Sequence, residues 1–228
     1  SELDRAVVWT NSNPYRRLKV HIQPVPETGE ADLTIGVVEQ RPLRLVASYD
    51  NTGNEILGVN RYTAGVNYGN AWGRDHQVSY QFITSDDPKI FRAHNGDYRI
   101  PLSWRHVLAF SASYAQVNPT FLDDNFTQKG ESFTADAKYV IPFAKKRWRG
   151  EMSGTVGFKQ TNNNLEFGGI PQLGATIEVL TGSLSVAGAR EDQRGNWVVS
   201  AMLVGSPGKF SSRSTPQIYH ESRLGANP

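Results

Sequence analysis

The sequence predicts a mainly β fold, namely about nine strands of the wall of an outer-membrane antiparallel β-barrel, preceded by a short α+β unit. Three observations predict it. Strand-length segments alternate apolar and polar residues, their connections alternate between long and short, and four of the five tryptophans lie in or beside the short connections. Alternation with a period of two is typical of a strand between two unlike environments.

Residues 1–42 form the first predicted domain. Leu3, Val7 and Val8 have helical spacing and are followed by the stop at 11–14. Residues 15–24 and 31–40 are rich in β-forming residues and flank a predicted turn at 26–30. A unit of this size has too little core to be stable alone, so we expect it to complete a larger domain.

Residues 43–228 form the second predicted domain, a partial transmembrane barrel. In its first strand, Leu43 and Leu45 alternate with Arg44 and Ser48. The same pattern predicts strands near residues 43–50, 61–68, 77–82, 97–102, 108–114, 132–141, 151–159, 176–189 and 197–205. Long polar loops are expected at 51–59, 85–90, 118–131, 161–174 and from 207 onward, and short turns at 69–75, 103–105, 144–148 and 191–196.

Barrels of the bacterial outer membrane have short periplasmic turns and longer extracellular loops, so we expect the N-terminal segment to be periplasmic. Tryptophans in the short turns then form a predicted interfacial girdle: Trp72, Trp104, Trp148 and Trp197. The alternatives are chance placement near strand ends, or tryptophans that cap the core of a soluble sandwich.

Charged residues on the polar faces of the strands are predicted to face the lumen, because they would otherwise lie in lipid. They are Arg61, Arg92, Asp97, Arg99, Asp136, Lys138, Glu151 and Lys159. Either they fill the barrel as mutual ion pairs or they line a conduit for a polar polypeptide. The sequence leaves both interpretations open.

Composition excludes several classes of protein. No apolar run approaches the ~18 residues of a helical membrane span, and the absence of cysteine removes disulfides and thiol chemistry. The histidines lack metal-binding spacing and no nucleophile elbow occurs. We therefore expect no enzyme activity, cofactor or metal, and the formal net charge of +2 does not favour nucleic-acid binding. No signal peptide is recognisable, so the chain is expected to be processed or to be part of a longer one.

Two segments carry a family resemblance: residues 9–17, Trp-Thr-Asn-Ser-Asn-Pro-Tyr-Arg-Arg, and residues 69–77, Gly-Asn-Ala-Trp-Gly-Arg-Asp-His-Gln. Together with 32–33, 38–44, 49–53 and 98–106, they resemble the TpsB transporters of two-partner secretion, the haemolysin and filamentous-haemagglutinin secretion and activation family, which is related to BamA. The resemblance implies that residues 1–42 are the end of a POTRA domain. It also implies that residues 43–228 are the N-terminal half of the barrel, so the chain is expected to be a fragment, or a truncated gene product, of such a transporter. The later strands and the loop with the family's arginine motif are lacking, so no residue of that loop is carried over.

The expected function is export of an unfolded partner exoprotein from the periplasm to the cell surface across the bacterial outer membrane. The expected partners are this exoprotein, outer-membrane lipids and the remainder of the barrel. A passive porin or surface barrel is an alternative, and a soluble β-sandwich or lipocalin-like binding protein is a less favoured one. The two stacked sheets of a sandwich would contradict the barrel.

Overall fold

The computed structural model describes residues 2–25, 30–119, 126–145, 147–167, 170–173, 176–192, 195–215 and 217–218. The chain begins with helix α1 (Glu2–Thr10) and a two-stranded hairpin, β1 (Arg16–Val25) and β2 (Glu30–Glu39). The large sheet contains β3 (Leu43–Asp50), β4 (Arg61–Ala71), β5 (His76–Thr84), β6 (Phe91–Pro101), β7 (Val107–Val117), β8 (Phe126–Lys145), β9 (Trp148–Phe167), β11 (Thr176–Asp192) and β12 (Gly195–Gly205). A short strand, β10 (Ile170–Leu173), pairs only with β9.

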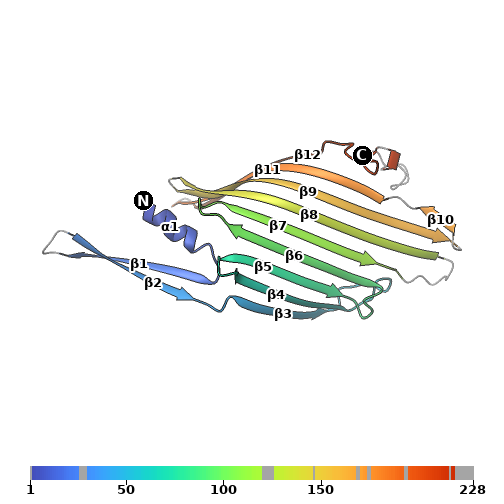
Figure 1. The fold of residues 1–228 in the computed structure, drawn as a ribbon, viewed down its shortest axis with the longest axis horizontal. Coiled ribbons are helices and arrows are strands. Elements are labelled where there is room, and N and C mark those ends of the chain that lie inside the picture. Colours follow the sequence, from blue (N-terminus) through green and yellow to red (C-terminus); the bar gives the residue numbers. More distant parts are fainter. Residues whose placement is uncertain are drawn as a thin grey trace.

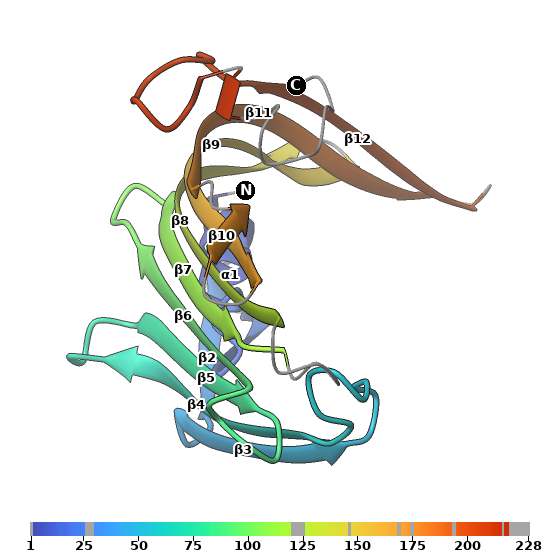
Figure 2. The ribbon, with the colours of Figure 1, turned by 90° about the vertical axis from the view of Figure 1, so that its right-hand side faces the viewer.

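The large sheet is antiparallel, and its strands follow chain order from β3 to β12 (Figure 1). The nine predicted strands are confirmed. The sheet curls strongly along its width, and its edge strands β3 and β12 do not pair with each other (Figure 2). It is one curved sheet without a second sheet packed on it, so the sandwich alternative is wrong for the described residues. Nor does this part of the chain contain a helix long and apolar enough to cross a membrane.

Two predicted loops are wrong in extent. Strands β8 and β9 each have 20 residues, so the predicted loops at 118–131 and 161–174 begin or end inside paired strand. Pairing continues as far as Phe126 with Phe167. The reason is that the regular alternation of apolar and polar residues, on which the prediction depends, is lost in these extensions, whereas the backbone pairing continues. Of the predicted turn at 26–30, residues 26–29 lie outside the described part of the chain.

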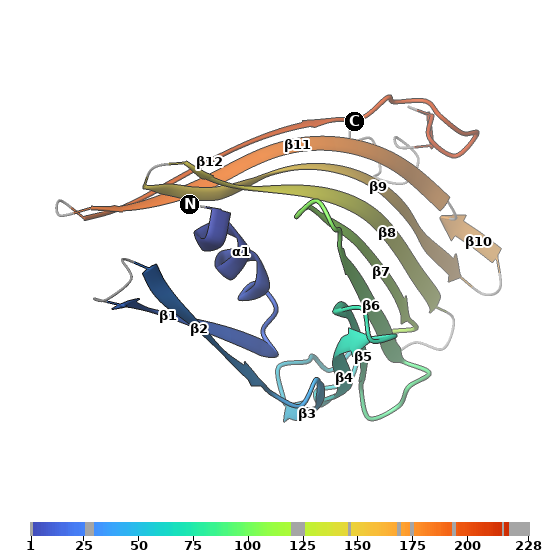
Figure 3. The ribbon, with the colours of Figure 1, turned by 60° about the vertical axis from the view of Figure 1, so that its left-hand side comes forward.

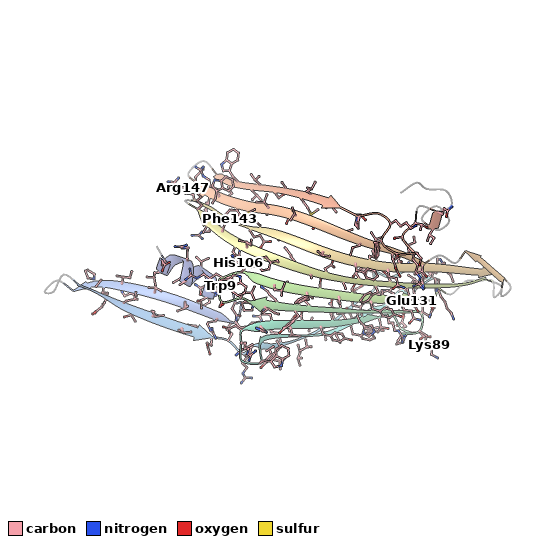
Figure 4. The ribbon with its side chains drawn as sticks, turned by 45° about the horizontal axis from the view of Figure 1, so that its top comes forward. Trp9, Lys89, His106, Glu131, Phe143 and Arg147 are labelled. Carbon is pink, nitrogen blue, oxygen red and sulfur yellow. The ribbon has the colours of Figure 1, made fainter. Side chains whose placement is uncertain are left out.

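The connections at one end of the sheet are short, at 72–75 and 102–106, and this end is called the short-turn end. The opposite, long-loop end carries the connections at 51–60 and 85–90. Figure 4 shows Trp9, His106, Phe143 and Arg147 at the short-turn end, and Lys89 and Glu131 at the long-loop end. Val107, the first residue of β7, pairs with Val140 of β8. Strand β8 continues for five more residues to Lys145, which pairs with Trp148 of β9. Such a stagger between hairpins accompanies the strand tilt of a barrel wall.

Strand register divides the side chains between two faces, because directly paired residues share a face. The outward face carries Tyr68, Phe110 and Val156, and the concave face carries Asp97, Ser111 and Asp136. The large apolar side chains that are exposed on strands β4 to β11 all lie on the outward face: Tyr62, Tyr68, Tyr80, Phe110, Phe133, Tyr139, Ile141, Met152, Val156, Leu184 and Val186. Those buried in the same strands, such as Val107, Val140 and Ile177, lie on the concave face, where curvature crowds side chains together.

Helix α1 and the β1–β2 hairpin lie at the short-turn end, with α1 on the concave side of the sheet (Figure 3). Trp9 and Thr10 line one pocket together with Gln77, Arg99 and Val107, which belong to the concave face. The structure thus confirms a helix followed by a hairpin. Whether this unit is the end of a POTRA domain stays a prediction.

Candidate functional site on the concave face and at the short-turn end

Seven of the eight charges predicted to face the lumen share the concave face. They are Arg61, Asp97, Arg99, Asp136, Lys138, Glu151 and Lys159. The register forms an acidic row, Asp97–Ser111–Asp136, beside a basic row, Arg99–Ala109–Lys138. That this face borders a water-filled lumen stays a prediction.

Some of these charges have partners within the face. Lys138 Nζ lies 3.3 Å from Glu151 Oε1, and both side chains are well exposed. Ser79 donates a hydrogen bond to Asp97 Oδ2 at 3.1 Å. The concave face therefore combines local ion pairing with charged groups open to the space inside the curve, and neither of the two interpretations of these charges is excluded.

Arg92 is the exception. The register pairs it with Thr84 and Gln116, on the outward face and opposite to Asp97 and Arg99. Its guanidinium donates to Gln116 Oε1 at 2.6 Å, near the long-loop end of the sheet. Strand β6 runs without a bulge from Phe91 to Pro101, so even-numbered Arg92 cannot share a face with the odd-numbered charges. Its assignment to the lumen face is wrong.

Arg61 shapes the loop at 51–60. Its Nη1 donates to the backbone carbonyls of Leu57, Gly58 and Asn60 at 2.7–3.2 Å. Its guanidinium also lies over the Phe91 ring, 4.6 Å from the ring centroid. This side chain therefore holds the loop against the long-loop end of the concave face and is less available to a passing molecule than the other charges.

The four predicted girdle tryptophans all lie on the outward side of the short-turn end. Trp72 packs edge-on against Tyr98, with ring centroids 5.6 Å apart. Trp104 donates from Nε1 to the Tyr139 hydroxyl. The register places Trp148 and Trp197 on the outward face, both aligned with Arg190. Their contact with a lipid interface stays a prediction.

The two segments that carry the family resemblance meet at the short-turn end. Arg16 Nη1 lies 2.9 Å from Asp75 Oδ2, and Arg16 Nε lies 3.1 Å from Glu39 Oε1. Tyr15 is buried, and its ring occupies the space where a side chain at Gly69 would stand. Sequence reasoning missed this joint. The sequence feature that could have indicated the joint is Gly69, a glycine near the end of β4, because a glycine within a strand often marks a close approach of another group.

A pocket of about 720 Å³ separates α1 and β1 from the β8–β9 hairpin. Its walls are largely apolar, with Leu3, Val7, Val8, Val20 and Ile22 on one side, and three arginines join the lining: Arg5, Arg105 and Arg149. Within the described ranges, no cluster of three or more histidine, aspartate or glutamate side chains could hold a metal ion. The short-turn end thus has an open, largely apolar pocket with arginines in its lining.

Comparison with solved structures supports the barrel fold. CdiB from Escherichia coli matches 93% of this chain with a TM-score of 0.75 at 12% sequence identity, and CdiB from Acinetobacter baumannii matches 84% with a TM-score of 0.59 at 16% identity. The chain covers 41% and 37% of those structures, about two fifths of their length. No curated protein matches the sequence.

The family comparison extends over most of the large sheet. Residues 29–169, from the hairpin to the end of β9, match the model of the haemolysin secretion/activation protein family ShlB/FhaC/HecB. The match includes the β4–β5 turn and the charged rows of the concave face. The chain therefore belongs to the ShlB/FhaC/HecB family of haemolysin secretion/activation proteins.

Proposed function

We propose that this chain is part of an outer-membrane translocator that exports an unfolded partner exoprotein from the periplasm to the cell surface. The observation that carries the proposal is the opposite polarity of the two faces of one curved sheet. Apolar side chains cover the outward face, whereas the concave face bears the acidic and basic rows. A wall of this kind separates hydrocarbon from a wet interior.

In this proposal, residues 43–228 contribute wall strands to a barrel that other strands complete, and residues 1–42 are the end of a periplasmic POTRA domain. The short-turn end is periplasmic and the long-loop end faces the cell exterior. Trp72, Trp104, Trp148 and Trp197 form the interfacial girdle on the periplasmic side, in contact with lipid. Such a protein is a transporter and has no enzyme activity.

The concave charges suit a polypeptide in transit better than a fixed ligand. Adjacent rows of opposite sign offer weak, exchangeable contacts to charged groups of either sign along an unfolded chain, without one deep site that would trap it. The position of α1 at the short-turn end of the concave face would place the periplasmic segment at the entrance.

The test is deletion of the gene that encodes this chain, followed by analysis of the proteins released into the culture medium. We expect loss of one large secreted protein, its accumulation or degradation in the periplasm, and restoration on complementation. Unchanged medium proteins, together with slower uptake of small hydrophilic solutes, would show a porin and overturn the proposal.

A second test uses the acidic row. Replacing Asp97 and Asp136 together by asparagine removes two charges but keeps their size, so barrel assembly should remain normal while secretion of the same protein slows. The matched control is Arg92→Gln, which removes a charge from the outward face at the long-loop end and should leave secretion unchanged.

A further inference from the structure

The joint between the N-terminal hairpin and the β4–β5 turn combines a buried aromatic ring, an ion pair and backbone hydrogen bonds. Tyr15 is one of the few buried apolar residues among those described. Its backbone N–H donates to Asn13 Oδ1 at 3.0 Å, and its carbonyl accepts from the Gln40 N–H at 2.8 Å. The backbone on both sides of the hairpin is thereby fixed at Tyr15.

The Tyr15 ring is held between two barrel strands. On β4, Gly69 lies so close that an added Cβ would overlap the ring. On β3, the guanidinium carbon of Arg44 lies 5.2 Å from the ring centroid, a cation–π arrangement. The Gly69 N–H donates to the Pro42 carbonyl at 2.8 Å, so the short connection between the hairpin and β3 is anchored at the same place.

Arg16 adds a polar contact beside the ring. Its guanidinium forms one ion pair within the hairpin, with Glu39, and a second across the joint, with Asp75. The backbone of Asp75 is fixed in turn. Its N–H donates a hydrogen bond to Asn70 Oδ1 at 3.0 Å, and the residue has a left-handed φ of 58°. A planar, forked cation can satisfy both carboxylates at once, which a lysine cannot do with the same geometry.

We propose that Tyr15 and Arg16 are positioning residues that clamp the periplasmic hairpin to the β4–β5 turn at one fixed angle and so hold α1 across the periplasmic opening of the concave face. The clamp itself is a property of the fold, whereas its importance for export rests on the proposed function. Its two components have separate roles: the ring sets the contact point, and the Arg16–Asp75 pair prevents rotation about that point.

The experiment measures the distance between the hairpin and the barrel in the gene product that contains this chain, reconstituted in lipid nanodiscs. Two spin labels are attached at Lys19→Cys on β1 and Arg147→Cys at the β8–β9 turn, both exposed and away from the joint. The chain has no cysteine of its own, so these thiols are unique within it. Pulsed electron paramagnetic resonance then gives the distribution of label separations.

With the clamp intact we expect one narrow population. Asp75→Asn, which keeps the size of the side chain but removes the pair across the joint, should broaden it, and Gly69→Ala should replace it by a displaced population. The matched controls are Glu39→Gln, which breaks only the pair inside the hairpin, and Tyr15→Phe, which keeps the ring. Both should retain the narrow population, and Arg16→Lys should give an intermediate width.

An unchanged distribution in both Asp75→Asn and Gly69→Ala overturns the clamp, as does equal broadening in Glu39→Gln. Each variant is also checked for normal heat-modifiable mobility, which reports barrel assembly. A broadened distribution with full export overturns the role in export but not the clamp. Absence of export in the unmodified protein would instead contradict the proposed function, and the distance measurement remains valid in that case.

Discussion

The indole of Trp104 donates a hydrogen bond from Nε1 to the hydroxyl of Tyr139 at 2.9 Å. His106 Nδ1 lies 2.7 Å from the same oxygen. The preceding hairpin repeats this grouping, since Trp72 and His76 both pack against Tyr98 and His76 Nδ1 lies 2.6 Å from the Tyr98 hydroxyl. In each case the tryptophan and the histidine lie in or directly beside a short turn, and the next hairpin along the sheet supplies the tyrosine. The repeat joins neighbouring hairpins at the short-turn end of the outward face.

These hydroxyls are predicted to contribute to stability. Tyr139→Phe removes the acceptor of Trp104 and the partner of His106, and should lower the free energy of unfolding by about 1 kcal/mol. Urea unfolding of the reconstituted protein, followed by tryptophan fluorescence, measures it. Tyr68→Phe is the control, because that outward-facing hydroxyl forms no hydrogen bond with any of the described residues. Equal effects of the two substitutions would contradict the role of the repeat.

Adjacent residues of β7 test the polarity of the two faces. Phe110→Arg places a charge on the outward face and should block outer-membrane assembly, at a cost of roughly 2–4 kcal/mol if the position is near the bilayer midplane. Ser111→Arg should be tolerated, because it places a cation between Asp97 and Asp136 on the concave face. Heat-modifiable mobility of outer-membrane fractions reports assembly. Equal tolerance at both positions would count against the membrane wall.

Two glycines of neighbouring strands should differ sharply. A Cβ at Gly157 would overlap the Asp136 carboxylate and lie 3.0 Å from Thr181 Oγ1, whereas nothing lies within 4 Å of one at Gly182. Gly157→Ala should therefore force the Asp136 carboxylate out of its position and destabilise the fold by roughly 0.5–1.5 kcal/mol, the cost of a side chain held away from its preferred rotamer, and Gly182→Ala should be neutral or slightly stabilising. The same urea titration compares them. A neutral Gly157→Ala would mean that the Asp136 side chain moves freely.

The Lys138–Glu151 pair is predicted to add little to stability. Its side chains are 39% and 49% exposed, so a double-mutant cycle with alanine should give a coupling energy of about 0.2–1 kcal/mol. This coupling should fall as salt is added. A larger, salt-independent value would indicate that the concave face excludes water, contrary to the wet interior proposed for it.

The sequence predicts most of the large sheet because each wall strand alternates between two unlike surroundings. The bounds fail where that contrast ends. Residues 161–167, Thr-Asn-Asn-Asn-Leu-Glu-Phe, show little alternation, yet they continue β9 in register with β8. Backbone pairing continues the strand there, and backbone pairing leaves no periodic pattern in the side chains.

Odd and even positions along each strand are sufficient to assign seven of the eight predicted charges to the concave face. Arg92 lies outside the predicted strand, which begins at Asp97, so its face does not follow from that strand. Once β6 is known to begin at Phe91, the even number of Arg92 places it opposite to Asp97 and Arg99. The joint could not be predicted in this way. Arg16 of the N-terminal hairpin and Asp75 of the β4–β5 turn are 59 residues apart, and periodicity does not report contacts between separate units.

Within the four residues that connect β4 to β5, Trp72 turns outward to Tyr98 and Asp75 turns toward Arg16. Both residues have a left-handed φ, 57° and 58°, and Gly73 between them has 66°. A tight loop of this kind has little freedom to bend between its two attachments. If the β4–β5 hairpin is tilted within the proposed membrane wall, this loop would therefore carry the tilt over to the N-terminal unit, and the two would turn together at this corner of the molecule.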